Sequence, residues 1–455
     1  MKKFMILTLL CTLMGLTRTM AQEAYAVFDR NSKLTFYYDN KSSSRTGEHF
    51  PVPLNKLDEV DVQWKTIATR LTTVEFDPSF ADARPTNTSD WFSVMLILKT
   101  IIGLEYLNTS EVTSMANMFA LCRELRSLDL THFNTAKLKK TSWMFYGCEK
   151  LVTICVGDGW TNDVNSNSEY MFIGCHSLVG GNGYKYNDMH HTITKACIDG
   201  KDGQTGYFTS AEKVSETYGL WLGGTQVTYM NKDDVFFDGR ASYNPDTKTL
   251  TFGGIELEGQ GNSSDASTGY GCGIYSKISG LTIHMEGGCK GKGATGCNGI
   301  RLDGNTTVTG GAYPLAGQGN IGVNVSAGEL TVGGDVTLEG DGIGENSIGI
   351  MGYMTVRPSM TFYTTLTVKD NATVRARGTV AGIARLANLV LENHAITSPA
   401  GAVWNESRHA VCNSEGNPIK ERWMFIEYKQ PSRADVNGDG SVDSADIVAV
   451  IKEMK

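Results

Sequence analysis

The sequence predicts a mainly β fold with short helices, arranged as two repeat-built domains and a small C-terminal module. Three observations predict it: a Met-Phe-x-x-Cys word that recurs every 26 or 27 residues, short β-branched strands between glycines in the middle of the chain, and a twelve-residue loop of oxygen-bearing side chains near the end. Domains usually contain roughly 100 to 200 residues, so 455 residues can form several cores. We expect domains over residues 22–212, 213–430 and 431–455, after a leader over residues 1–21.

The first segment has the features of a cleaved secretory signal. It reads MKKFMILTLLCTLMGLTRTMAQ, with two lysines, an apolar run and then small or polar residues. No later stretch has the roughly 18 to 20 apolar residues that a membrane-spanning helix needs. The formal charge of −8 argues against a nucleic-acid partner, whose phosphates call for a basic face. We therefore expect a protein that is secreted or held at the cell surface.

The recurring words of the first domain are MFALC, MFYGC and MFIGC, and their phenylalanines are Phe119, Phe145 and Phe172. Each word is followed by a short strand of the L-x-x-L-x-L kind. A strand recurring every 20 to 29 residues is the signature of a leucine-rich-repeat solenoid. One repeat cannot bury its apolar side alone, so stacked copies share a continuous core. This arrangement predicts reduced, buried core cysteines at Cys122, Cys148 and Cys175.

A longer stretch of this domain resembles a known family. NTSEVTSMANMFALCRELRSLDLTHFNTAKLKKTSWMFYGCEKL is similar to the BspA-type leucine-rich-repeat surface proteins. The flanks AYAVFDRNSKLTFYYDN, VEFDPSFADARPTNTSDWF and IDGKDGQTGYFT resemble the caps of that family, so the resemblance covers residues 24–209. It implies a surface-exposed or secreted protein that binds a host or bacterial surface protein or glycan, and it implies no catalytic residues.

One face of the repeat strands is the predicted partner-binding surface. Alternate residues of a strand point in opposite directions, and solenoids commonly use their exposed strand face for recognition. The residues expected on that face are Lys99, Arg126, Ser127, Asp129 and Thr153.

The middle of the chain has a different texture, and most of the 51 glycines lie there. The segments GIYSKISGLTI, GIRLDGNTTVT, GVNVSAGELTV and GIARLANLVL form a looser repeat of β-branched strands, which is typical of a β-helix-like solenoid. An irregular β-sandwich is the alternative, because YGLWLGGTQVT and ASYNPDTKTLTF alternate like antiparallel strands around a turn. Cys289 and Cys297 lie eight residues apart, and the sequence leaves their disulfide state open.

β-Helices also occur as polysaccharide lyases and hydrolases, which need carboxylates that converge on adjacent coils. The acids of this domain fall at different offsets within their repeats and lie beside glycines, so we interpret them as turn residues. These acids are Asp303, Asp335, Glu339 and Asp341. The sequence thus predicts a non-enzymatic adhesion or binding protein without catalytic residues. The alternative is an extracellular polysaccharide-degrading lyase or glycoside hydrolase.

The chain closes with DVNGDGSVDSADIVAVIKEMK, whose first twelve residues follow the ligand spacing of an EF-hand loop. The predicted calcium ligands are Asp435, Asn437, Asp439, Ser441, Asp443 and Asp446. The loop and the apolar segment after it resemble a dockerin repeat, although dockerins carry two such loops and this chain has one. The resemblance implies a cohesin-like partner and assigns its recognition to Ser444 and Ala445.

Overall fold

The computed structural model describes residues 21–55, 62–161, 169–261, 270–355 and 361–429. The chain divides into two compact units, residues 1–214 and residues 215–455. The described residues are mainly β strands with short 3-10 helices, so the predicted class is confirmed. None of these helices has the length and apolar character that crossing a bilayer would require. The 3-10 helices are η1 (Ser42–Ser44), η2 (Gln63–Arg70), η3 (Pro78–Asp82), η4 (Leu104–Tyr106), η5 (Ile193–Lys195), η6 (Lys201–Gly203) and η7 (Ala211–Lys213).

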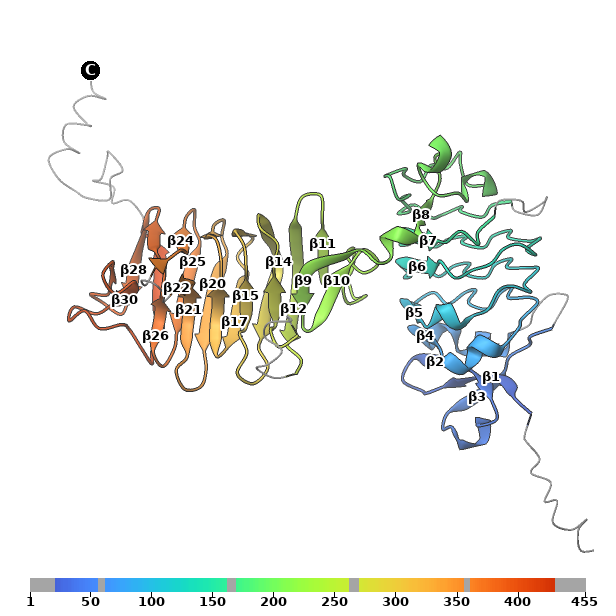
Figure 1. Ribbon diagram of the computed structural model, residues 1–455, viewed down its shortest axis with the longest axis horizontal. Helices are drawn as coiled ribbons and strands as arrows, with labels where there is room; N and C mark the ends of the chain where they lie inside the picture. The colour runs from blue at the N-terminus through green and yellow to red at the C-terminus, as the bar shows by residue number, and fades with distance from the viewer. Residues whose placement is uncertain (1–20, 56–61, 162–168, 262–269, 356–360, 430–455) are drawn as a thin grey trace, which may run out of the picture. The chain divides into compact units, whose positions relative to one another are not determined.

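Two sheets form the first unit (Figure 1). The five-stranded sheet has the order β3-β1-β2-β4-β5, and the three-stranded sheet has the order β6-β7-β8. Pairing is antiparallel around β1 and parallel from β2 to β5 and from β6 to β8. The strands are β1 (Glu23–Phe28), β2 (Lys33–Asp39), β3 (Glu48–Pro51), β4 (Thr73–Phe76), β5 (Thr100–Ile102), β6 (Ser127–Leu130), β7 (Thr153–Val156) and β8 (Phe208–Ser210).

The core of this unit is a column of phenylalanines, one from each repeat word. The ring centroids lie 5.5 Å apart for Phe92 and Phe119, 5.7 Å for Phe119 and Phe145, and 5.6 Å for Phe145 and Phe172. All four side chains are fully buried. Offset aromatic stacking and the loss of apolar surface from water both stabilise such a column. The predicted repeat register is therefore present in the packing.

Two large sheets form the second unit, and Figure 1 shows their strands side by side. The nine-stranded sheet has the order β10-β9-β13-β15-β18-β21-β26-β30-β29. Its strands are β9 (Thr217–Leu222), β10 (Thr225–Thr228), β13 (Ile274–Ser276), β15 (Ile300–Leu302), β18 (Ile321–Val325), β21 (Ile348–Gly352), β26 (Ala381–Ala384), β29 (Val403–Asn405) and β30 (Ala410–Cys412).

The twelve-stranded sheet has the path β27-β24-β19-β16-β14-β17-β20-β25-β31-β28, with β11 and β12 joined to β14. A separate pair consists of β22 (Met354–Thr355) and β23 (Thr361–Phe362). The strands of the large sheet are β11 (Ala241–Asn244), β12 (Thr249–Glu258), β14 (Leu281–Lys292), β16 (Thr306–Gly310), β17 (Pro314–Gly319), β19 (Leu330–Val332), β20 (Thr337–Gly342), β24 (Thr365–Val368), β25 (Thr373–Arg377), β27 (Asn388–Leu391), β28 (His394–Ser398) and β31 (Met424–Tyr428).

Parallel pairing dominates the second unit. The predicted antiparallel segments are present as the pairs β9 with β10 and β11 with β12, but β13, β15, β18, β21 and β26 then pair in parallel. Side chains stack in register along the large sheet, with an inward aliphatic row and an outward threonine row next to it. The inward row is Leu250, Ile283, Val308, Val332, Val368 and Leu391, and the outward row is Thr249, Thr282, Thr307, Thr331 and Thr367. β-branched residues suit such a pleated, half-buried surface.

Glycines recur here because the two sheets approach each other closely where the chain passes from one to the other. A Cβ atom at Gly349 would lie 2.6 Å from the carbonyl oxygen of Gly382 and 2.7 Å from the backbone nitrogen of Arg377. Backbone atoms cannot move aside cheaply at such distances, so only glycine fits. The same backbone crowding is present at Gly273, Gly299 and Gly322, which open three of the looser repeats.

Candidate functional site

The loops that carry the repeat words share an unusual backbone. The residue before each methionine, or at the equivalent place in the first copy, has a left-handed conformation: φ is 63° at Asp90, 57° at Asn117, 63° at Trp143 and 62° at Tyr170. This conformation turns the N–H toward the next repeat. Asn117 N donates to Ser142 O at 3.0 Å, and Trp143 N donates to Glu169 O at 3.2 Å.

Two of these four positions hold bulky aromatic residues. Asparagine and aspartate tolerate the left-handed region, whereas a bulky side chain there is a genuine outlier. The left-handed backbone costs an L-residue about 1 to 2 kcal/mol. Trp143 and Tyr170 therefore carry a conformational cost that Asn117 avoids at the same place in its repeat. Strain of this kind concentrates at functional sites, where another requirement selects the side chain.

The two strained residues belong to a continuous row of rings, which we call the aromatic row: Tyr146, Trp143, Tyr170 and His191. The Trp143 centroid lies 5.0 Å from that of Tyr146 and 4.9 Å from that of Tyr170, and Tyr170 stacks on His191 at 5.9 Å. Trp143 is 38% exposed and Tyr170 is 39% exposed. Exposed Trp and Tyr are the side chains that most often anchor ligands, because they offer large rigid contact areas.

A ladder of buried cysteines links the backbones of neighbouring repeats. The thiols of Cys122, Cys148 and Cys175 donate to the carbonyl oxygens of Phe92 at 3.2 Å, Phe119 at 3.1 Å and Phe145 at 3.0 Å. All three are free and fully buried, as predicted. Burial raises the pKa of the Cys148 thiol to about 12, so it stays protonated at neutral pH. These thiols serve the core and are not nucleophiles.

The residues of the predicted strand face come from two separately hydrogen-bonded sheets. Lys99 directly precedes β5, whereas Arg126, Ser127 and Asp129 lie at β6, and β5 and β6 belong to different sheets. All four side chains are half-buried. The Asp129 carboxylate already accepts hydrogen bonds from the backbone N–H of Thr131 at 3.0 Å and from its hydroxyl at 2.6 Å.

The prediction that Thr153 is exposed is wrong. Its exposed fraction is 4%. The strand β7 is the middle strand of its sheet, and the segment after the last repeat covers its start, where Val179 N donates to Val152 O at 2.9 Å. The sequence placed Thr153 correctly in the strand, but the covering segment removes it from any binding surface.

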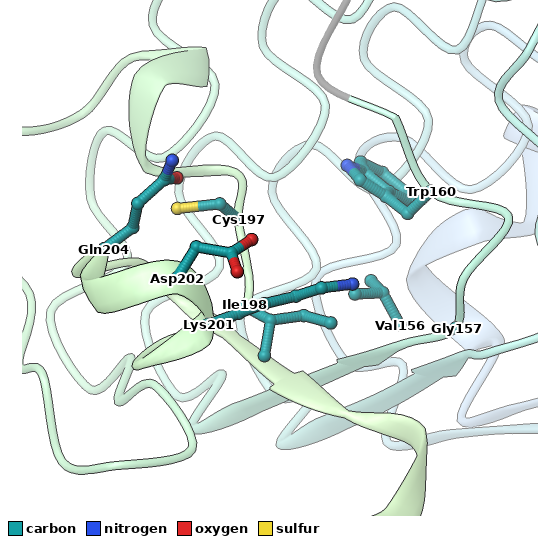
Figure 2. A pocket seen from close by; sticks show the side chains of 8 residues that line it. All are labelled: Val156, Gly157, Trp160, Cys197, Ile198, Lys201, Asp202 and Gln204. Carbon is teal, nitrogen blue, oxygen red and sulfur yellow. The ribbon is translucent and has the colours of Figure 1, made fainter.

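A small polar pocket lies where β7 ends, beside this covering segment (Figure 2). Its volume is about 200 Å³. The Trp160 indole Nε1 is buried without a hydrogen-bond acceptor among the described residues, and it lines the same space as the side chains of Cys197, Lys201 and Asp202. A buried N–H without an acceptor costs free energy, which a hydroxyl or carbonyl group of a ligand would recover. The pocket can thus hold one small polar group.

The adjacent histidines His190 and His191 both make local hydrogen-bond contacts. His190 Nδ1 is 2.6 Å from the Tyr184 hydroxyl, and His191 Nδ1 is 2.7 Å from the Asp188 carbonyl oxygen. Within the described ranges, no group of three or more His, Cys, Asp or Glu residues is placed to hold a metal ion. The predicted calcium ligands, together with Ser444 and Ala445, lie outside the described residues.

The interpretation of the second unit's acids as turn residues is only partly correct. Asp335 lies in a turn and accepts from Asn371 at 3.0 Å, but Glu339 and Asp341 lie within β20. Asp341 accepts from Arg377 Nε at 2.6 Å, and Glu339 lies 3.4 Å from Arg375 Nη1. Glycines alternate with these acids along the strand and take the inner-face positions.

Asp303 is likewise held in a closed cluster. It follows β15 and accepts from Arg301 Nε at 2.9 Å and from the Tyr275 hydroxyl at 2.7 Å. Burial opposes ionisation of Asp303, but the hydrogen bonds from Arg301 and Tyr275 outweigh it and lower the pKa of the carboxyl. Cys289 and Cys297, whose disulfide state the sequence left open, are buried and form no disulfide bond within the described residues.

Sequence reasoning missed the aromatic row. The available signal was the residue before Met in each word, which changes from Asn117 to Trp143 and Tyr170 in successive repeats. When a repeat position changes from a turn-forming residue to large aromatic residues, the backbone turn does not explain the change. Such a change indicates that the side chain at this position serves the protein surface. The strained backbone that makes the change informative is visible only in the structure.

Part of the first unit is similar to a known family of proteins. A family model described as "Mycoplasma protein of unknown function, DUF285" matches residues 84–181, which include three of the four rings of the aromatic row. No curated protein and no solved structure matches the chain.

Proposed function

We propose that this protein is a secreted or cell-surface binding protein without catalytic activity, and that the aromatic row of the first unit contacts a glycan. The observation that carries this proposal is the pair Trp143 and Tyr170, two exposed rings kept on a costly left-handed backbone. A sugar ring has apolar faces and polar edges, which suits a line of amphipathic rings. The formal charge of −8 disfavours the nucleic acids that also stack on aromatics.

The polar pocket at Trp160 supports the same class of ligand. Its unpartnered indole N–H and the ammonium, carboxylate and amide groups of Lys201, Asp202 and Gln204 match the hydrogen-bonding needs of sugar hydroxyls. In the second unit, Asp303, Glu339 and Asp341 each lie beside an arginine. Carboxylates neutralised in this way favour a binding role over acid–base chemistry.

The finer fold assignments belong to this proposal. Parallel strands one repeat apart and a stacked core support a BspA-type leucine-rich-repeat solenoid in the first unit. Two largely parallel sheets that enclose a core support a β-helix in the second unit. For residues 435–446 we propose one bound calcium ion, and for Ser444 and Ala445 contact with a cohesin-like partner. Together these parts describe an adhesion protein with an attachment module.

A glycan and host-protein array probed with the full chain tests the proposal. The variant Trp143→Asn plus Tyr170→Asn removes both rings while keeping residues that tolerate the left-handed backbone. We expect glycan binding by the parent and a loss of at least about tenfold in the variant, a typical effect for anchor residues. A matched control is Met189→Ala, which removes a side chain that is 83% exposed outside the row. Equal glycan binding by all three proteins, or binding to proteins only, would refute the proposal.

A further inference from the structure

The outer face of the second unit's large sheet has an ordered pattern of charge. Two rows of side chains cross the strands β12, β14, β17, β20 and β25 in register, and the residues between them point into the core. The first row is Glu256, Lys290, Ala316, Glu339 and Arg375, and the second row is Glu258, Lys292, Gln318, Asp341 and Arg377. Each row therefore reads acid, base, neutral, acid, base. We call these ten residues the striped face.

Part of this pattern has an ordinary explanation. Acids and bases on neighbouring strands stabilise a sheet by cross-strand pairing. Such pairs are present: Glu258 lies 2.7 Å from Lys292, Glu339 3.4 Å from Arg375, and Asp341 2.6 Å from Arg377. Cross-strand pairing within one sheet does not require this order of charges. A pair with the base on the first strand and the acid on the second would stabilise the sheet equally well.

The observed order has a second property. If one row is laid against a second copy of itself in reverse order, each acid lies opposite a base. The neutral residue in the middle lies opposite its own counterpart. Two copies of the face, packed against each other around a two-fold axis parallel to β17, would thus be complementary at every position. A two-fold interface is isologous, so each contact occurs twice.

We propose that the striped face docks a second copy of this chain, with the β17 strands of the two copies facing each other across a two-fold axis parallel to both. In the first row, Glu256 faces Arg375 of the second copy, Lys290 faces Glu339 of the second copy, and Ala316 faces its own counterpart. In the second row Glu258 faces Arg377 and Gln318 faces Gln318, while Lys292 lies opposite the buried Asp341, whose carboxylate is held by Arg377 of its own chain.

Charge and size define the character of this contact. The charges of the four acids and four bases cancel, so the face does not attract a polyanion or a polycation. A surface that carries the same charges in reverse order is complementary to it. The five strands are about 4.8 Å apart, which makes the interface small and the association weak. Apart from Asp341, which is buried, the charged side chains of the face are exposed or half-buried, so salt should weaken the contact.

Trp423 and Phe425 extend the match beyond the last base. Phe425 pairs with Arg375 across β25 and β31, and the Arg377 guanidinium lies 4.7 Å from the centroid of the Trp423 ring. In the two-fold arrangement these rings lie beyond Glu256 and Glu258 of the second copy, at the start of its striped face. They would cover the stems of the outermost acids there.

Sedimentation velocity of the full chain tests the proposal. We expect a monomer–dimer equilibrium at roughly 100 μM protein in low salt, which shifts to monomer as added salt shortens the Debye length to about 3 Å near 1 M. Lys290→Glu and Glu339→Lys should each abolish self-association, because each places like charges opposite one another. An equimolar mixture of the two variants should dimerise again, since each introduced charge then faces an opposite charge on the other variant.

Rescue by mixing separates docking from misfolding, because a misfolded variant cannot recover through its partner. Lys248→Glu, at the exposed turn between β11 and β12, is the charge-matched control and should dimerise like the parent. Thermal melts of all variants are recorded alongside. A parent that stays monomeric in low salt would overturn the proposal, as would self-association unchanged in Lys290→Glu or a mixture that remains monomeric.

Discussion

The rings of Trp143 and Tyr170 lie 4.9 Å apart, centroid to centroid, and both residues have a left-handed backbone, with φ of 63° and 62°. Adjacent repeats thus place the same strained position side by side. Alignment of the repeats makes the contact, because the Trp143 N–H is committed to the carbonyl oxygen of Glu169, next to Tyr170. The pair links a repeat periodicity to a surface that presents large rings.

Replacement of Trp143 by asparagine should leave the fold intact and make it slightly more stable. Asparagine tolerates the left-handed region, so the variant recovers part of the cost of about 1 kcal/mol that tryptophan bears there. Loss of the ring contacts with Tyr146 and Tyr170 offsets some of this gain. Chemical denaturation should give an unfolding free energy equal to or above that of the parent. A loss of more than about 2 kcal/mol would mean that the ring is a packing residue.

Replacement of Phe145 by alanine should destabilise the first unit by about 3 to 5 kcal/mol, since the change leaves a cavity in the phenylalanine column. Phe145 is fully buried between Phe119 and Phe172. Differential scanning calorimetry of the full chain should show a markedly lower melting temperature for one transition. The exposed Met189→Ala change serves as the control, and a Phe145→Ala variant that melts with the parent would contradict the packing described here.

Among the nine described cysteines, Cys197 should be the one that reacts with alkylating agents in the native protein. It is half-buried, whereas the other eight are buried. Burial raises the pKa of its thiol, so the reaction should be slow at neutral pH and accelerate as pH increases. Peptide mapping after labelling identifies the site, and Cys197→Ser should remove the native-state label. Comparable labelling of Cys148 before unfolding would be inconsistent with its burial.

Replacement of Asp341 by asparagine should cost about 1 to 3 kcal/mol at pH 7, because a buried charge-assisted hydrogen bond is lost. Burial opposes ionisation of Asp341, but the hydrogen bonds from Arg377 and Gln318 dominate and lower the pKa of the carboxyl in the folded state. Its contribution is therefore complete above the unfolded pKa of about 3.9 and disappears as pH falls through the lower folded value. Parent and variant should differ at pH 7 and converge in strong acid. A gap that persists there would exclude this ion pair as its cause.

The segment 435–446 should bind one calcium ion, which isothermal titration calorimetry of the full chain can detect. Asp435→Ala plus Asp446→Ala removes the first and last predicted ligands and should abolish the binding heat. Ser444→Ala leaves every predicted ligand in place and should bind like the parent. Absence of binding at about millimolar calcium, or binding unchanged in the double variant, would refute the assignment.

The sequence by itself determined the features that repeat locally. The spacing of Phe119, Phe145 and Phe172 predicted a stacked core, and the strands between glycines predicted a mainly β second unit. These predictions succeeded because apolar residues at a fixed period must share one buried column. The cysteines at Cys122 and Cys148 followed from the same rule. Outward residues carry no such constraint, which is why the predicted strand face was only partly correct.

The tertiary structure alone decided which outward residues share a surface. Thr153 is buried under a covering segment. The segment that follows the last repeat supplies His191, which stacks on Tyr170 and so extends the row that begins with Trp143. The acid and base stripes were hidden because loops of unequal length separate them. Glu256 and Lys290 are 34 residues apart, whereas Ala316 and Glu339 are 23 apart. Hydrogen-bond register between parallel strands fixes such rows, and register depends on the whole packed sheet rather than on spacing along the chain.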